Sequence, residues 1–163
     1  MQTQPWLGIE GQEATLKEKP REAVDGVDIT FFIKLYNYGH SPAIDIVSSI
    51  PHETFGGRFG REPRSLSKTL CDAADQDSKT VDPEYGPELV VWPGTSHEYR
   101  IDVHSQSFAG TYATGCFSYK SRSGDIHDTF FVYRIGMDRG DPNGEDHTLR
   151  ITGIELVSMQ PLQ

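Results

Sequence analysis

The sequence predicts an all-β protein, an immunoglobulin-like Greek-key β-sandwich with one short inserted helix. Short segments in which apolar and polar residues alternate recur along the chain, and clusters of Gly, Pro, Asn and Asp separate them, as is typical of half-buried antiparallel sheets. About seven such segments suit a sandwich better than a closed barrel. One further segment repeats its apolar residues at helical spacing.

The clearest strand covers residues 27–36, where apolar and polar side chains fall on opposite faces. Phe32 is the exception to this alternation. The apolar face consists of Val27, Ile29, Phe31, Ile33 and Leu35. We expect these residues to share a core with Tyr99, Ile101, Val103, Phe117 and Tyr119. The other expected strands are residues 6–16, 43–50, 98–103, 112–120, 126–133 and 149–157.

A helix is expected over residues 65–75, as a crossover between strands. Leu66, Leu70 and Ala74 recur at the spacing of one helical face, and Ser65 is a suitable N-cap. This helix contains Cys71, while Cys116, the other cysteine of the chain, falls in a late strand. A disulfide between them would fasten the crossover to the sheet, but two separate buried thiols fit the sequence equally well.

Length and charge limit the classes of protein. A chain of 163 residues has the size of one domain, so we expect a single sandwich over residues 1–163, with residues 136–163 as a possible C-terminal extension of it. The net charge of −9 disfavours binding to nucleic acids and to anionic lipids. No apolar run is long enough to span a membrane, and the start of the sequence lacks the features of a signal peptide. Two interpretations remain open: a cytosolic protein, or a domain that has been separated from its membrane anchor.

Five segments carry a resemblance to known domains. They are residues 6–10 (WLGIE), 37–43 (NYGHSPA), 92–94 (WPG), 115–119 (GCFSY) and 127–131 (HDTFF). This pattern resembles uncharacterised bacterial domains that follow one or two N-terminal transmembrane helices. The turn after the second strand, residues 37–43, is also similar to bacterial cell-adhesion-related immunoglobulin-like domains.

The resemblance implies an extracytoplasmic sandwich, periplasmic or at the cell surface, that is membrane-anchored in the native protein. The chain departs from the pattern in two respects. It contains no transmembrane helix, and the residues beyond Arg134 are not part of the pattern.

The sequence shows no constellation of catalytic residues, so we expect no enzymatic activity, no cofactor and no metal. It has no nucleophile elbow and no phosphate-binding loop, and its His residues do not occur at metal-ligand spacing. The acidic residues 138–146 are similar to calcium loops in their oxygen ligands, but their spacing differs from that of an EF-hand. A solvated acidic loop is the alternative interpretation of this segment.

We therefore expect a non-enzymatic interaction or structural domain. The alternatives are a carbohydrate-binding module and an enzyme of unknown class. A coplanar row of exposed aromatic rings on a sheet face would favour sugar binding, whereas a polar face with one apolar loop would favour contact with a protein.

The expected partner surface is the loop of residues 52–64, which is basic and aromatic within an acidic chain. Aromatic residues and Arg are enriched at interface hot spots, and Arg can bind a carboxylate of the partner through two hydrogen bonds. The residues proposed to bind the partner are Phe55, Arg58, Phe59, Arg61 and Arg64. The alternative is that both Phe side chains fill the end of the core.

Overall fold

The computed structural model describes residues 4–16, 27–51, 63–79, 89–105, 111–139 and 149–162. This part of the chain forms strands and one helix, in the order β1 (Leu7–Leu16), β2 (Val27–Asn37), β3 (Ala43–Ser49), α1 (Pro63–Lys79), β4 (Val90–Val91), β5 (Ser96–Ser105), β6 (Thr111–Lys120), β7 (Ile126–Arg139) and β8 (Leu149–Leu162). The prediction of an all-β protein with one short helix is confirmed.

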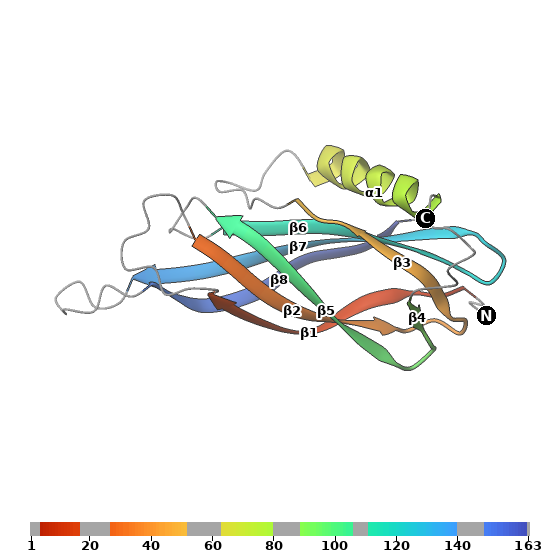
Figure 1. Ribbon diagram of the computed structural model, residues 1–163, viewed down its shortest axis with the longest axis horizontal. Helices are drawn as coiled ribbons and strands as arrows, with labels where there is room; N and C mark the ends of the chain where they lie inside the picture. The colour runs from red at the N-terminus through yellow and green to blue at the C-terminus, as the bar shows by residue number, and fades with distance from the viewer. Residues whose placement is uncertain are drawn as a thin grey trace.

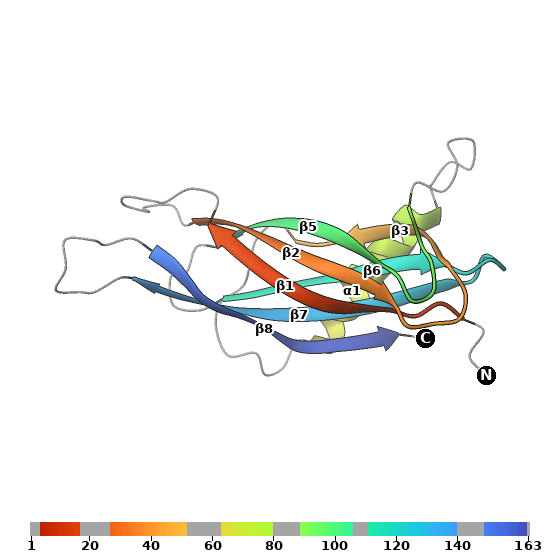
Figure 2. The same ribbon diagram turned by 90° about the horizontal axis from the view of Figure 1, so that it is seen from below.

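The strands form two antiparallel sheets that pack face to face (Figures 1 and 2). The three-stranded sheet has the order β1-β2-β5, and the five-stranded sheet has the order β4-β3-β6-β7-β8. The chain therefore crosses between the sheets after β2, after β4 and again after β5. Helix α1 lies along the outer face of the five-stranded sheet, where it contacts β3, β6 and β7.

The core lies between the two sheets and contains the apolar face of β2. Ile29, Phe31, Ile33 and Leu35 are buried, as the alternation predicted, while the side chain of Val27 lies outside the described residues. They pack with Ile101, Val103 and Phe117, and the half-buried Tyr99 joins them. Tyr119 is also buried, but it packs in a neighbouring cluster with Leu7, Ala43 and Val91.

The structure extends several of the expected elements. Strand β7 continues to Arg139 and β8 to Leu162, because the two strands pair with each other along a long hairpin. Helix α1 is longer than expected at both ends. Strand β4 was not predicted, since its two residues are too few to show a period.

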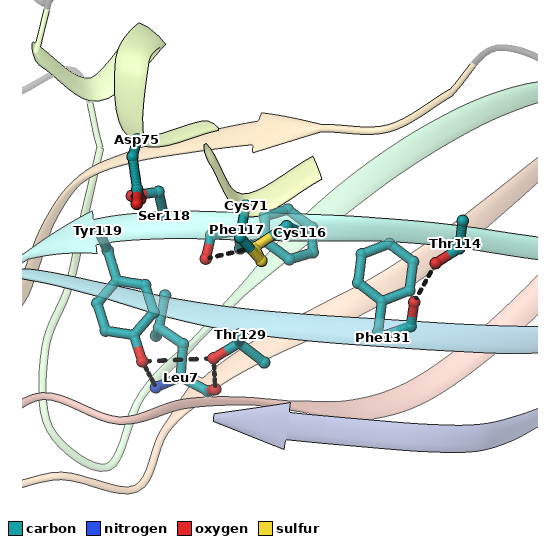
Figure 3. Close-up of a disulfide and its surroundings, with 10 residues drawn as sticks. All are labelled: Leu7, Cys71, Asp75, Thr114, Cys116, Phe117, Ser118, Tyr119, Thr129 and Phe131. Carbon is teal, nitrogen blue, oxygen red and sulfur yellow. Dashed lines mark hydrogen bonds between the residues drawn. A yellow bond between two sulfur atoms is a disulfide. The ribbon is translucent and has the colours of Figure 1, made fainter. Parts of the chain in front are cut away.

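Cys71 and Cys116 form a disulfide that joins α1 to β6 (Figure 3). Their Cα atoms lie 5.2 Å apart, within the range that a disulfide requires. Both cysteines are buried, together with Leu70 of the helix and Phe130 and Val132 of β7. Of the two alternatives left open by the sequence, the structure shows the bridge. Disulfides of this kind are typical of proteins in oxidising compartments.

Two buried tyrosines differ in the hydrogen bonding of their hydroxyl groups. The Tyr119 hydroxyl accepts a hydrogen bond from the Leu7 N–H at 3.2 Å and lies 3.3 Å from the Thr129 hydroxyl (Figure 3). The Tyr133 hydroxyl is buried in the core and has no hydrogen-bond partner among the described residues. Burial raises the pKa of both groups, so both hydroxyls stay neutral at physiological pH.

Replacing these tyrosines with Phe should change stability in opposite directions. Tyr133→Phe removes a buried polar group that has no partner, so the free energy of unfolding should rise by about 1 kcal/mol. Tyr119→Phe leaves the Leu7 N–H without an acceptor and should lower it by about 1–2 kcal/mol. Urea denaturation followed by circular dichroism measures both changes. Equal losses in the two variants would contradict this interpretation of the Tyr133 hydroxyl.

Candidate functional site

The exposed aromatic side chains of the described residues gather at one end of the sandwich. Trp6, Tyr38 and Trp92 are the large hydrophobic side chains there that reach solvent, with exposed fractions of 36%, 40% and 53%. They come from the start of β1, the end of β2 and the end of β4, which all lie at the right of Figure 1. The half-buried Tyr36 and the exposed Arg122 complete the group. We call these five residues the aromatic end.

The rings of Trp6, Tyr36 and Tyr38 contact one another but are not coplanar. The centroids of Trp6 and Tyr38 lie 5.0 Å apart with 41° between the ring planes. The centroids of Tyr36 and Tyr38 lie 4.6 Å apart with 58° between the planes. The guanidinium of Arg122, in the β6–β7 hairpin, lies 6.0 Å from the centroid of the Trp92 ring, at the limit of a cation–π interaction. The rings therefore form an uneven surface rather than a flat platform.

Tyr38 is held in place from two sides. Its ring lies over Gly8, where a Cβ atom would come within 2.6 Å of the ring, so only glycine leaves room for it. Its hydroxyl donates a hydrogen bond of 2.7 Å to the Glu10 carboxylate. This hydrogen bond, with a smaller contribution from burial, raises the pKa of Tyr38 to about 12. Tyr38 thus presents one fixed ring face and a neutral hydroxyl to solvent.

Asn37 organises the backbone beneath these rings. Its side-chain oxygen accepts hydrogen bonds from the N–H groups of Trp6 (3.2 Å) and Gly39 (2.9 Å). Its side-chain nitrogen donates to the carbonyls of Ser41 (2.8 Å) and Val91 (2.9 Å). The Asn37 side chain is buried, with an exposed fraction of 1%. It joins three backbone segments, which carry or adjoin Trp6, Tyr38 and Trp92.

The turn that follows Trp92 is tied to the same asparagine through its backbone. The N–H of Gly94 donates to the Asn37 carbonyl at 2.9 Å, and the N–H of Asn37 donates to the Thr95 carbonyl at 3.1 Å. Gly94 has a φ of 73°, a left-handed conformation that glycine adopts without strain. The turn is therefore rigid on its inner side, while Trp92 faces outward.

Most of the partner surface predicted from the sequence lies outside the described residues. This applies to Phe55, Arg58, Phe59 and Arg61. The backbone of Arg64 lies in the first turn of α1, but its side chain is not among those described. Of the acidic segment 138–146, only Asp138 and Arg139 are described, at the end of β7. Neither prediction is therefore tested.

Other polar groups of the described residues do not converge on one point. No group of three or more His, Cys, Asp or Glu side chains in that part of the chain is arranged to hold a metal ion. His104 Nδ1 lies 2.8 Å from the Asp28 carboxylate on the outer face of the three-stranded sheet. Within the same residues, no helix has the length and apolar character needed to cross a membrane.

Comparison with known proteins does not assign the chain to a family. The chain matches no protein-family model, no curated protein and no solved structure. The aromatic end was not predicted as a site, although two of its members lie in the turns that the sequence does indicate, at residues 37–43 and 92–94. An aromatic residue inside a turn motif is the signal that could have found it, because turns lie on the surface.

Proposed function

We propose that this chain is a non-enzymatic interaction domain that binds a protein partner through the aromatic end. The observation that carries the proposal is the gathering of Trp6, Tyr38 and Trp92 at one end of the sandwich, since these are the exposed large hydrophobic residues of the described chain. Exposed apolar side chains that lie together mark contact surfaces, whereas isolated ones need no explanation. Trp, Tyr and Arg are also the residue types most enriched at binding hot spots.

The rigidity of this end supports the proposal. Binding costs less when the side chains that make contact are already ordered. Tyr38 is fixed by Gly8 and Glu10, and Asn37 fixes the backbone beside Trp6 and Trp92. An aromatic surface held in this way loses little conformational entropy on binding.

Ring geometry favours a protein partner over a carbohydrate. A sugar ring stacks on a flat aromatic face, and a chain of sugars needs coplanar rings. The planes of Trp6, Tyr36 and Tyr38 are instead tilted by 41° and 58° between neighbours. Tilted rings present an uneven surface, which suits the side chains of a protein partner.

We also propose that the domain is an immunoglobulin-like Greek-key sandwich. Strands β1, β2 and β5 would correspond to strands A, B and E of such domains, and β3, β6 and β7 to strands C, F and G. Strand β4 would then be an added edge beside β3, and β8 an added edge beside β7. The disulfide supports an extracytoplasmic location, and the resemblance of the sequence pattern alone implies an N-terminal anchor.

The proposed function can be tested with a random peptide library displayed on phage. Peptides selected on the wild-type chain should lose about tenfold or more in affinity for the double variant Tyr38→Ala/Trp92→Ala, because hot-spot truncations typically cost at least this much. The matched control is Arg58→Ala/Phe59→Ala in the loop of residues 52–64, which should bind the same peptides normally. Melting temperatures verify that both variants fold.

Two outcomes would overturn the assignment. Normal binding by the aromatic-end variant together with loss in the loop variant would move the interface to residues 52–64. Failure to select any peptide, with binding to an immobilised polysaccharide such as cellulose, chitin or xylan that depends on Trp92, would favour a carbohydrate-binding module instead.

A further inference from the structure

Helix α1 is joined to β6 by two contacts (Figure 3). The distance between them is similar along the helix and along the strand. Cys71 and Asp75 are one helical turn apart, a rise of about 6 Å. Cys116 and Ser118 lie on the same face of β6, about 6.6 Å apart along the strand. Cys71 forms the disulfide with Cys116, and the Asp75 carboxylate accepts a hydrogen bond of 2.9 Å from the Ser118 hydroxyl.

A second carboxyl group lies beside this hydrogen bond. Asp128 on β7 is the cross-strand neighbour of Ser118, so the Asp128 and Asp75 carboxyl groups both lie next to the Ser118 side chain on the helix-covered face of the sheet. One oxygen of Asp128, Oδ1, is buried and has no donor among the described residues. Two carboxylates in such contact repel each other when both are ionised, whereas one proton shared between them makes a strong hydrogen bond.

The charged groups around this pair do not neutralise it. On α1, Asp72 adds a further negative charge near Asp128. On β6, Lys120 is already paired with Asp45 of β3, at 3.5 Å. On β8, the residues that run alongside Asp128 are Gln160, Pro161 and Leu162, which carry no charge. Lys79 follows Asp75 by one helical turn, but it is exposed and forms no ion pair with Asp75 among the described residues. A shared proton can therefore relieve the repulsion between Asp75 and Asp128.

We propose that α1 is a pH-dependent cover on the outer face of the five-stranded sheet. A proton shared by Asp75 and Asp128 holds the C-terminal half of the helix closed. Loss of that proton loosens this half, and the Cys71–Cys116 disulfide keeps the helix attached while it moves. This movement would expose Ala74 and Ser78, which are buried on the inner side of the helix, while Leu70 and Cys71 stay packed against Phe130 and Val132.

The direction of the pH dependence follows from the environment of Asp128. Its burial and the neighbouring Asp75 raise the pKa of Asp128 from 3.8 to about 7. The folded state therefore binds more protons than the unfolded state between about pH 4 and pH 7. The stabilisation due to this proton is complete below that range and is lost as the pH rises through 7. The cover should be closed in mildly acidic solution and loose in alkaline solution.

Hydrogen–deuterium exchange of the full chain tests the proposal, after correction for the intrinsic pH dependence of exchange. Between about pH 5.5 and pH 8, the protection of amides in residues 74–79 should fall about tenfold, while that of residues 29–35 in β2 should not change in parallel. Asp128→Asn supplies a permanent donor to Asp75 and should keep the helix protected at both pH values. Asp77→Asn, at an exposed position of α1, is the matched control and should keep the wild-type response.

Two results would overturn the cover. One is a pH-independent protection of α1 in the wild type, and the other is an equal fall in the wild type and in Asp128→Asn. If Asp128→Asn does not fold, Asp75→Asn serves the same purpose, because it also replaces one of the two carboxyls with a neutral amide. These experiments do not involve the aromatic end, so their outcome is independent of the proposed function.

Discussion

Replacing Phe31 with Ala should lower the free energy of unfolding by about 3–5 kcal/mol. Phe31 lies in the middle of β2, the central strand of the three-stranded sheet, and its side chain is completely buried. Its ring meets that of Tyr133 in an edge-to-face contact with centroids 5.6 Å apart. The substitution therefore removes a large apolar side chain and an aromatic pair from a core that cannot close over the space.

The neighbouring residue provides a matched control. Phe32 is the same residue type one position further along the strand, but it lies on the opposite face and is partly exposed. Phe32→Ala should cost less, about 1–2 kcal/mol, since part of the Phe32 ring already lies in solvent and its removal leaves no enclosed cavity. Denaturation by guanidinium chloride measures both variants, and Phe31→Leu gives an intermediate value if Phe31→Ala does not fold. Similar losses for Phe31→Ala and Phe32→Ala would contradict the two-faced strand.

Replacing Asn37 with Ala should lower the free energy of unfolding by about 2–4 kcal/mol and should also disorder the aromatic end. The change leaves two N–H groups and two carbonyls without the partner that Asn37 now provides. Buried backbone groups without a partner are costly, and several lie in one connected network here. Thermal unfolding gives the loss of stability, and the near-ultraviolet circular dichroism of Trp6 and Trp92 reports the loss of order.

A second substitution at position 37 distinguishes the hydrogen bonds that the side-chain nitrogen donates from those that the side-chain oxygen accepts. Asn37→Asp keeps an oxygen for the N–H groups of Trp6 and Gly39, but it places a carboxylate oxygen against the carbonyls of Ser41 and Val91. It should therefore destabilise the protein as well. The nearby exposed residue His40 is the control, since His40→Ala should change stability by about 0.5 kcal/mol or less. Wild-type stability of Asn37→Asp would show that the two donated hydrogen bonds contribute little.

The strands were predictable where alternation is long and regular. Strand β2 illustrates this, because its buried residues follow every second position from Ile29 to Leu35. The same rule extends into β7 beyond its expected end, since Phe131, Tyr133 and Ile135 are all buried. The expected strand ended at Tyr133, although Ile135 continues its alternation.

The arrangement of the strands into sheets depends on information that local patterns do not carry. Alternation shows which side chains share a face, but not which strand lies beside which. Strand β4 contributes only Val90 and Val91 and is defined by its partners on β3 rather than by its own sequence. The disulfide could not be predicted for the same reason. Cys71 and Cys116 are 45 residues apart in the sequence, and their distance in space depends on how α1 packs against β6.

The aromatic end shows a different limit of prediction. Alternation places Tyr119 in the core and the turn motif places Tyr38 near the surface, but neither pattern shows that Trp6, Tyr38 and Trp92 lie at the same end of the sandwich. The turn at residues 37–43 is readable from its Asn, Gly and Pro. The four side-chain hydrogen bonds of Asn37 could not be predicted from the sequence, because one partner, Val91, lies 54 residues away along the chain.

The hydrogen bonds that hold β1 have a consequence for how the chain folds. The N–H and carbonyl of Leu7 bond to Tyr119 and Thr129, which are 112 and 122 residues further along the chain. The N–H of Ile9 donates to the sulfur of Met159, 150 residues away. Such contacts must close long loops before they add stability, and folding slows as their share increases. During synthesis, β1 therefore leaves the ribosome long before its partners exist, and the sandwich is completed only when nearly the whole chain has emerged.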